Sequence, residues 1–288
     1  MATVYERKIG VFQISMLLLF LLVMLVTLLP ILNILALSFS DKDPILRGQV
    51  GLLPVGFNVD AYRMVFNDSS MIKAFFYSLF LMALQLSLSM GATILAAYPL
   101  SKSTLPGRKC IMMMIVITMY FSAGTIPNYL LYKDLSLLNR IWVLLLPNMV
   151  SAFNLIILRT FCTTIHPSMY EAAYMDGCSE LRALISITLP LSKAAIVTLA
   201  MFYAVDRWNA VGDIILFIQD TSLYTLQYKL KLMLEVINIP YEEGVVQTVT
   251  PENFKSACIV FTMLPMLIMY PFVQKYFRDG VMIGSVKG

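Results

Sequence analysis

Charged side chains are scarce in this sequence of 288 residues: they make up 13% of it, against 59% hydrophobic residues. Soluble globular domains carry about 25% charged residues, so this composition excludes a soluble domain. Histidine is rarer still, since His166 is the single one. The net charge is only +4, and the basic residues flank apolar runs instead of forming a patch. This excludes nucleic acid as a partner and favours contact with a lipid bilayer.

Motifs of catalysis and nucleotide binding are also missing. The sequence has no G-x-x-x-x-G-K-[ST] loop to bind nucleotide phosphates, and one histidine cannot supply the H-E-x-x-H zinc motif. No G-x-S-x-G nucleophile elbow occurs either. The four cysteines, Cys110, Cys162, Cys178 and Cys258, lack paired metal-ligand spacing, and we expect them to be buried, small apolar residues. We therefore predict a chain with no catalytic residue, no metal site and no cofactor of its own.

Long uncharged runs are what the sequence has in abundance. As a helix, about 20 apolar residues cross a hydrocarbon core of about 30 Å. Runs of about this length or longer cover residues 9–40, 74–101, 110–132, 141–158 and 256–274. A weaker sixth run covers residues 194–205, with Lys193 at one interface and Asp206 and Arg207 at the other. The predicted fold class is all-α: a polytopic membrane protein with six transmembrane helices.

Positive charges beside the runs indicate the orientation. The first run is too long for a signal-peptide core of about 7 to 15 residues, and no small-residue cleavage site follows it, so we expect it to be retained. Basic residues close to span ends favour the cytoplasmic side. Arg7 and Lys8 precede the first run, and Lys102, Arg108 and Lys109 lie in the short loop after the second. The predicted N-terminus is therefore cytoplasmic.

The simplest organisation is one transmembrane domain over residues 1–288. Its outer loops cover residues 41–73 and 206–255, its inner loop covers residues 159–193, and a cytoplasmic tail covers residues 276–288. The outer segment 222–236 fits a strand by the alternation that starts at Tyr224, and a helix by the spacing of its leucines. An isolated strand would leave unpaired edge groups, which favours the helix, but the pattern alone leaves both open.

The inner loop contains a helical segment too short to span a membrane. Ser168 and Glu171, three residues apart, fit a capping box, in which each side chain satisfies a free backbone N–H at the start of a helix. Gly177 can adopt the left-handed conformation that ends a helix, so the helix has about two turns. So short a helix is marginal alone. Ala172 and Ala173 keep one face thin, which predicts that a partner packs against it.

This loop resembles the signature loop of bacterial binding-protein-dependent importer permeases, E-A-A-x-x-x-G followed by I-x-L-P. Its fixed positions are filled by Glu171, Ala172, Ala173, Gly177, Ile187, Leu189 and Pro190. The resemblance implies the type I ABC importer permease fold. It also implies that the loop, including Asp176, carries a coupling helix that docks into a groove on a cytoplasmic ATPase subunit. Glu171 would there face a basic residue of that partner.

Further segments resemble the carbohydrate branch of that family: residues 57–62 with 65–66, Trp208 with Asn209, and residues 280–288. The resemblance implies a bacterial cytoplasmic membrane, a second homologous permease subunit, two ATPase subunits that bind ATP and Mg²⁺, and an extracellular sugar-binding protein. In relatives the tail reaches toward the ATPase interface, so Gly284 and Lys287 are candidate contacts.

Polar and aromatic residues in or beside the spans are candidates for the substrate pathway, namely Gln85, Asn128, Asn148, Asn154, Tyr203 and Trp208. A neutral polar lining suits hydroxyl-rich solutes, although each residue equally fits a helix–helix hydrogen bond. The predicted function is half of the pathway for an oligosaccharide or polysaccharide-derived sugar, coupled to ATP by alternating access. Another small polar solute, such as a polyamine, is an alternative. An ion-coupled secondary transporter is disfavoured because the five clear runs contain no Asp, Glu, Lys or Arg.

Overall fold

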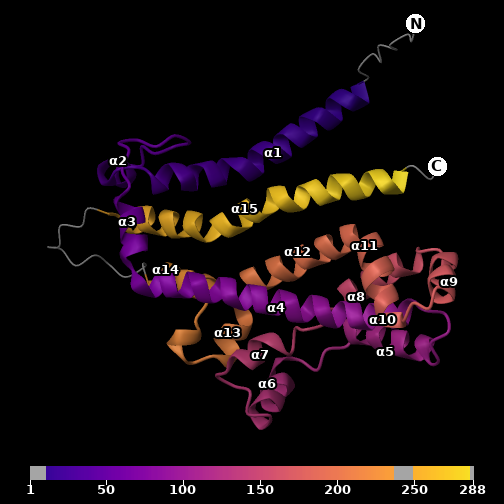
Figure 1. Ribbon diagram of the computed structural model, residues 1–288. Coiled ribbons are helices and arrows are strands. Elements are labelled where there is room, and N and C mark those ends of the chain that lie inside the picture. The colour runs from indigo at the N-terminus through magenta and orange to yellow at the C-terminus, as the bar shows by residue number, and fades with distance from the viewer. Residues whose placement is uncertain (1–10, 237–248, 286–288) are drawn as a thin grey trace, which may run out of the picture. The chain divides into compact units, whose positions relative to one another are not determined.

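The computed structural model describes residues 11–236 and 249–285, and every regular element within those ranges is helical (Figure 1). The predicted all-α fold class is thereby confirmed. The chain divides into two compact units, each made of two stretches. One contains residues 1–69 and 232–263, and the other contains residues 70–231 and 264–288.

The first unit contains α1 (Val11–Ser38), α2 (Lys42–Leu46), α3 (Asp60–Asn67) and the start of α15 (Pro251–Ser285). The Asn253 side-chain amide joins α15 to the end of α1, because it donates to the carbonyls of Leu37 and Ser40 at 2.7 and 3.1 Å. Phe66 of α3 meets Phe261 of α15 edge to face, with ring centroids 5.5 Å apart. The apolar stretch of α1 is 0% buried within the protein, which suits a helix surrounded by lipid.

The second unit holds the remaining elements, wholly or for the most part. They are α4 (Ser69–Ser101), α5 (Arg108–Tyr120), α6 (Thr125–Asp134), α7 (Ile141–Leu145), α8 (Ala152–Thr163), α9 (Pro167–Met175), α10 (Glu180–Ala183), the π-helical turn η1 (Leu184–Thr188), α11 (Leu189–Leu191), α12 (Lys193–Asn209), α13 (Gly212–Phe217), the 3₁₀ turn η2 (Thr221–Leu223) and α14 (Leu226–Val236).

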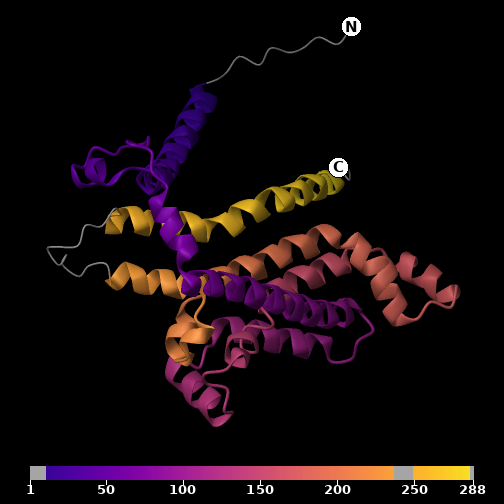
Figure 2. The same cartoon turned by 60° about the vertical axis from the view of Figure 1, so that its left-hand side comes forward.

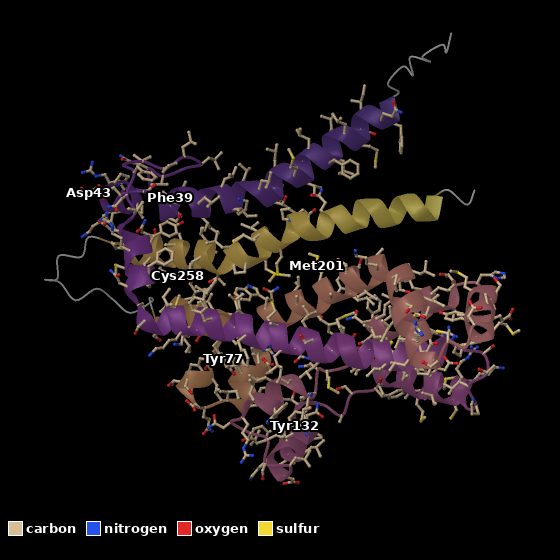
Figure 3. All side chains as sticks on the ribbon, viewed as in Figure 1. Phe39, Asp43, Tyr77, Tyr132, Met201 and Cys258 are labelled. Carbon is tan, nitrogen blue, oxygen red and sulfur yellow. The ribbon has the colours of Figure 1, made fainter. Side chains whose placement is uncertain are left out.

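Buried apolar clusters join the helices of this unit. Helices α4, α8 and α12 lie side by side (Figure 2). They pack around Ala97, Leu158 and Leu199. A second cluster joins α4 to α7 and α13, and Tyr77 and Tyr132 pack against its edge (Figure 3). The core of the second unit therefore lies between α4 and the helices that follow it in the chain.

Among the described residues, three helices are long and apolar enough to cross a membrane without interruption: α1, α4 and α15. They match the runs predicted at 9–40, 74–101 and 256–274, although α4 already begins at Ser69. Two bent pairs of helices also pass this test, α5 with α6 and the α10–α11 segment with α12, with bends of 115° and 83°. Each pair counted as one crossing gives up to five spans.

Two runs predicted as continuous helices are broken instead. Run 110–132 is divided between α5 and α6, where Gly124 has a φ of 90° that ordinary residues rarely adopt. Run 141–158 is divided into α7 and α8, and Pro147 lies in the non-helical segment between them. The outer segment 222–236, for which strand and helix are both compatible with the sequence pattern, is a helix from Leu226 onward.

Candidate functional site

The predicted coupling helix is α9, which extends from Pro167 to Met175. It begins before Ser168, so the predicted capping box is wrong. His166 is the N-cap residue instead, and its Nδ1 accepts a hydrogen bond from the backbone N–H of Ser168 at 3.3 Å. A proline at the first helical position favours this arrangement because it needs no N–H partner and holds the residue before it extended. Glu171 consequently has no capping role.

The first half of the coupling motif lies on the protein surface. Glu171, Ala172, Asp176 and Gly177 are exposed, and Ala173 is partly buried. Gly177 has a φ of 76°, as predicted, and an added Cβ would meet no atom within 4 Å. The backbone conformation, not lack of space, therefore favours glycine there. Glu171 makes no hydrogen bond or ion pair with the described part of the chain, so its charge is available to another protein.

The second half of the motif packs inward. Ile187 and Leu189 are partly buried against a cluster formed by Tyr98, Tyr170, Ala183 and Leu184, whereas Pro190 is exposed. This half passes through the π-helical turn and is followed by the 83° bend into α12. The π-helical turn and the bend together interrupt the helical path from this loop into α12. The motif combines an exposed helix with a packed base that adjoins a membrane helix.

A cluster of charged and aromatic residues at the base of α9 was missed by the sequence reading. The Lys102 Nζ lies 3.2 Å from the ring centroid of Tyr170 and 4.8 Å from that of Tyr98. It also donates to the Tyr174 hydroxyl at 3.3 Å. The Tyr98 hydroxyl donates to Glu180 Oε2 at 2.6 Å. The spacing of four between Tyr170 and Tyr174, and between Tyr98 and Lys102, was the available signal, since such pairs share a helix face.

Electrostatics in this cluster favour an ionised carboxylate. The pKa of Glu180 is held below its usual range, chiefly because the Tyr98 hydroxyl donates to it, with Tyr174 and Lys102 acting the same way against a desolvation effect. The pKa of Lys102 is lowered, because desolvation outweighs the attraction of Glu180. Desolvation also raises the pKa of Tyr170.

A polar cavity of about 460 Å³ lies beside the break between α7 and α8. Its lining includes Gln85, Asn148 and Tyr203 from the predicted substrate pathway, with Ser151, Asp206 and Arg207 as further polar members and Pro147, Val150 and Ala210 as apolar ones. Side chains satisfy the non-helical backbone at the break. The Gln85 Nε2 donates to the Asn148 carbonyl at 3.0 Å, and the Ser151 N–H donates to the Tyr203 hydroxyl at 3.0 Å. Irregular backbone at membrane depth is tolerated where it lines such a cavity.

The other pathway candidates lie elsewhere. Asn128 lines a smaller pocket of about 260 Å³, which shares Pro147 and Asn148 with the larger cavity. Asn154 is buried in α8. Trp208 is buried as well, edge to face with Phe75 at a centroid distance of 6.3 Å. The structure therefore brings together Gln85, Asn148 and Tyr203 but not the whole predicted set.

Arg207, which lines the cavity, belongs to a buried ion pair with Asp213. Arg207 was predicted at a membrane interface, but it is 5% exposed, and its guanidinium binds both carboxylate oxygens of Asp213, at 2.5 and 3.2 Å. It also donates to the Leu144 carbonyl at 3.2 Å. The neighbouring Asp206 is exposed, as expected for adjacent residues that point to different sides of a helix. Sequence alone did not reveal the partner in the next helix.

The predicted tail and the four cysteines differ in how far the structure describes them. Helix α15 continues through the predicted tail to Ser285, so Gly284 lies in its last turn, and Lys287 lies outside the described residues. Cys162 and Cys258 are buried as expected, whereas Cys110 is exposed and Cys178 is partly so. Within the described residues no group of three or more His, Cys, Asp or Glu side chains is placed to hold a metal ion.

Comparison with known proteins identifies a matching family and similar chains. The family model described as "Binding-protein-dependent transport system inner membrane component" matches residues 89–283. The polygalacturonan/rhamnogalacturonan transport system permease protein YtcP of Bacillus subtilis is 38% identical over 89% of this chain and 91% of its own. Protein LplC of the same organism is 36% identical over 99% of this chain and 98% of its own.

A solved structure has a closely similar fold. It is a chain in the crystal structure of a bacterial ABC transporter involved in the import of the acidic polysaccharide alginate. The TM-score is 0.89 and the sequence identity 32%, with 96% of this chain and 100% of that chain covered. The likeness therefore extends over both units of the chain.

Proposed function

Because the chain belongs to the family of binding-protein-dependent transport system inner membrane components, we propose that it forms half of the translocation pathway for an oligosaccharide or polysaccharide-derived sugar. It is a permease subunit of an ABC importer, an inner-membrane protein that does not itself hydrolyse ATP. The observation that carries the substrate proposal is the cavity beside the α7–α8 break. Gln85, Asn148, Ser151 and Tyr203 offer neutral hydrogen-bonding groups there, which suit sugar hydroxyls.

The proposed complex contains a second homologous permease, two cytoplasmic ATPase subunits and an extracellular sugar-binding protein. The ATPase subunits would bind ATP and Mg²⁺, since this chain has no phosphate-binding loop. The exposed face of α9, with Glu171, supports docking to an ATPase subunit. Closure of the ATPase dimer then switches the helices between inward-open and outward-open states.

The proposed orientation places the N-terminus and α9 in the cytoplasm. It rests on Arg7, Lys8, Lys102, Arg108 and Lys109, which adjoin the ends of the first two spans. Cys110 reports on it directly because it is exposed and follows this loop. A membrane-impermeant maleimide should label Cys110 only after permeabilisation. Labelling in intact cells would indicate the opposite orientation.

Stimulation of ATP hydrolysis by a loaded binding protein tests the proposed function. We expect the tagged chain to co-purify with ATPase activity, and a binding protein loaded with an oligosaccharide to stimulate that activity several-fold over the unloaded protein. Uronic acid oligomers, neutral oligosaccharides and polyamines should be compared at saturation. If only a polyamine-loaded binding protein stimulates hydrolysis, the substrate is a cationic solute and not a sugar. Transport by the isolated chain in liposomes would contradict the proposal that uptake is coupled to ATP.

Asp206 distinguishes the two substrate classes, because its exposed carboxylate lies in the cavity lining and favours a cation. For a sugar, Asp206→Asn removes one charge-assisted hydrogen bond, so we expect the maximal uptake rate to fall about tenfold or less. For a polyamine, the loss of the only uncompensated carboxylate among the described lining residues should nearly abolish uptake. Asp134→Asn, an exposed carboxylate of α6 outside both pockets, is the matched control and should leave uptake unchanged.

A further inference from the structure

Lys102 connects the coupling helix to the longest helix of the second unit. It directly follows α4, whose last residue is Ser101. Its ammonium lies 3.2, 4.8 and 5.7 Å from the ring centroids of Tyr170, Tyr98 and Tyr174. Tyr98 belongs to α4, whereas Tyr170 and Tyr174 belong to α9. One cation is therefore held by aromatic rings from both helices.

The Lys102 contact involves the residue through which α9 is anchored. Tyr170 is the only buried residue of α9, and a helix of two turns has little stability of its own. The Tyr170 ring contacts Lys102, and its hydroxyl hydrogen-bonds the Thr188 hydroxyl in the π-helical turn at 2.9 Å. Attraction between a cation and an aromatic face strengthens when the cation is desolvated, as it is for the partly buried Lys102.

The other end of this connection is the cavity. Helix α4 is continuous from Ser69 to Ser101, and it carries Gln85, which lines the cavity and holds the Asn148 carbonyl. The Tyr98 ring is fixed in turn by its hydrogen bond to Glu180 of α10. Movement of α9 can thus reach the cavity through Lys102 and a single unbroken helix.

We propose that Lys102 is a positioning residue for coupling, which holds α9 against the end of α4 so that displacement of α9 moves α4. This inference rests on the proposed function, since α9 is itself a proposed ATPase contact. It predicts that loss of the ammonium separates ATP hydrolysis from transport without affecting nucleotide binding, which takes place on another subunit.

Three substitutions isolate this role. Lys102→Met removes the charge and keeps an unbranched side chain. Lys102→Arg keeps a cation that stacks on aromatic rings. Lys109→Met makes the same chemical change at an exposed residue at the start of α5, outside the cluster, and is the matched control.

The assay uses the complete complex in proteoliposomes, with its ATPase subunits and a binding protein loaded with the sugar that stimulates it. We expect Lys102→Met to lower uptake about tenfold, the loss that corresponds to one desolvated cation–aromatic contact. The KM for ATP and the yield of assembled complex should not change. Because uptake falls while ATP hydrolysis continues, the ATP hydrolysed per sugar transported rises. Lys102→Arg should recover most of the uptake, and Lys109→Met should match the unmodified protein.

Two results would overturn the inference. One is equal uptake by Lys102→Met and Lys109→Met. The other is loss of the assembled complex in Lys102→Met without recovery in Lys102→Arg, which would show a role in folding. Glu171→Ala in the same assay separates the inference from the proposed function: if it uncouples transport while Lys102→Met does not, only the inference fails. If neither variant alters coupling, the proposed role of α9 fails with it.

Discussion

Glu171→Ala is expected to abolish coupled uptake while the chain still inserts into the membrane. Glu171 is exposed on α9 and has no partner in the described part of the chain, so its removal costs the isolated permease little. In a docked complex, truncating one member of a buried, hydrogen-bonded charge pair costs about 2–5 kcal/mol. That cost corresponds to about a 30-fold loss or more in affinity for the ATPase subunit.

The measurement is the rate of uptake in proteoliposomes at matched membrane levels, together with retention of the ATPase subunits during purification. Glu252→Ala is the matched control because Glu252 is an exposed glutamate at the start of α15, outside the coupling loop. Gly177→Leu supplies an independent test. It forces a side chain onto a backbone with a φ of 76°, at a cost of about 1–2 kcal/mol, and should disturb the end of α9. Normal uptake in both coupling-loop variants would contradict the docking role.

Asp213→Ala is expected to be the most destabilising single substitution proposed for this chain. The side chains of Arg207 and Asp213 are only 3% and 12% exposed, and their pairing leaves the guanidinium buried beside the Leu144 carbonyl. Removing one partner from a buried ion pair costs about 3–5 kcal/mol, because the other charge is left uncompensated. The lower stability should appear as a reduced midpoint of thermal unfolding for the complex in detergent.

Two further variants identify the cause. Asp60→Ala breaks the Arg63–Asp60 pair, whose side chains are 72% and 35% exposed, and should cost at most about 1 kcal/mol. The double variant Arg207→Met with Asp213→Leu removes both charges and should recover most of the lost stability. A double variant as unstable as Asp213→Ala would show that lost packing, not an uncompensated charge, is the cause.

The positions of apolar helices could be predicted from the sequence, whereas their interruptions could not. Uncharged runs are sufficient to locate α1, α4 and α15, since only a bilayer accommodates so many consecutive apolar residues. The same criterion fails at the α7–α8 break, because the residues around Pro147 carry no charge. Their backbone is satisfied by Gln85 and Tyr203, which are distant in sequence and invisible to a hydropathy pattern.

The coupling loop shows the same division. Its position, its length and the left-handed Gly177 follow from local residue preferences. Its cap was assigned to Ser168 because the capping-box pattern outweighed the effect of Pro167 on His166. The contacts that hold the helix, from Lys102 to Tyr170 and from Tyr98 to Glu180, join different elements. Only the tertiary structure reveals them.

At the α7–α8 break, weak hydrogen bonds between side chains and backbone form part of the cavity wall. Where α7 and α8 are interrupted, Gln85 of α4 and Tyr203 of α12 are among the side chains that hydrogen-bond the backbone. A hydrogen bond of this kind contributes about 0.5–1.5 kcal/mol net, so exchanging these bonds costs much less than unwinding a helix. Collective helix movements that would exchange such bonds take place on the microsecond-to-millisecond timescale.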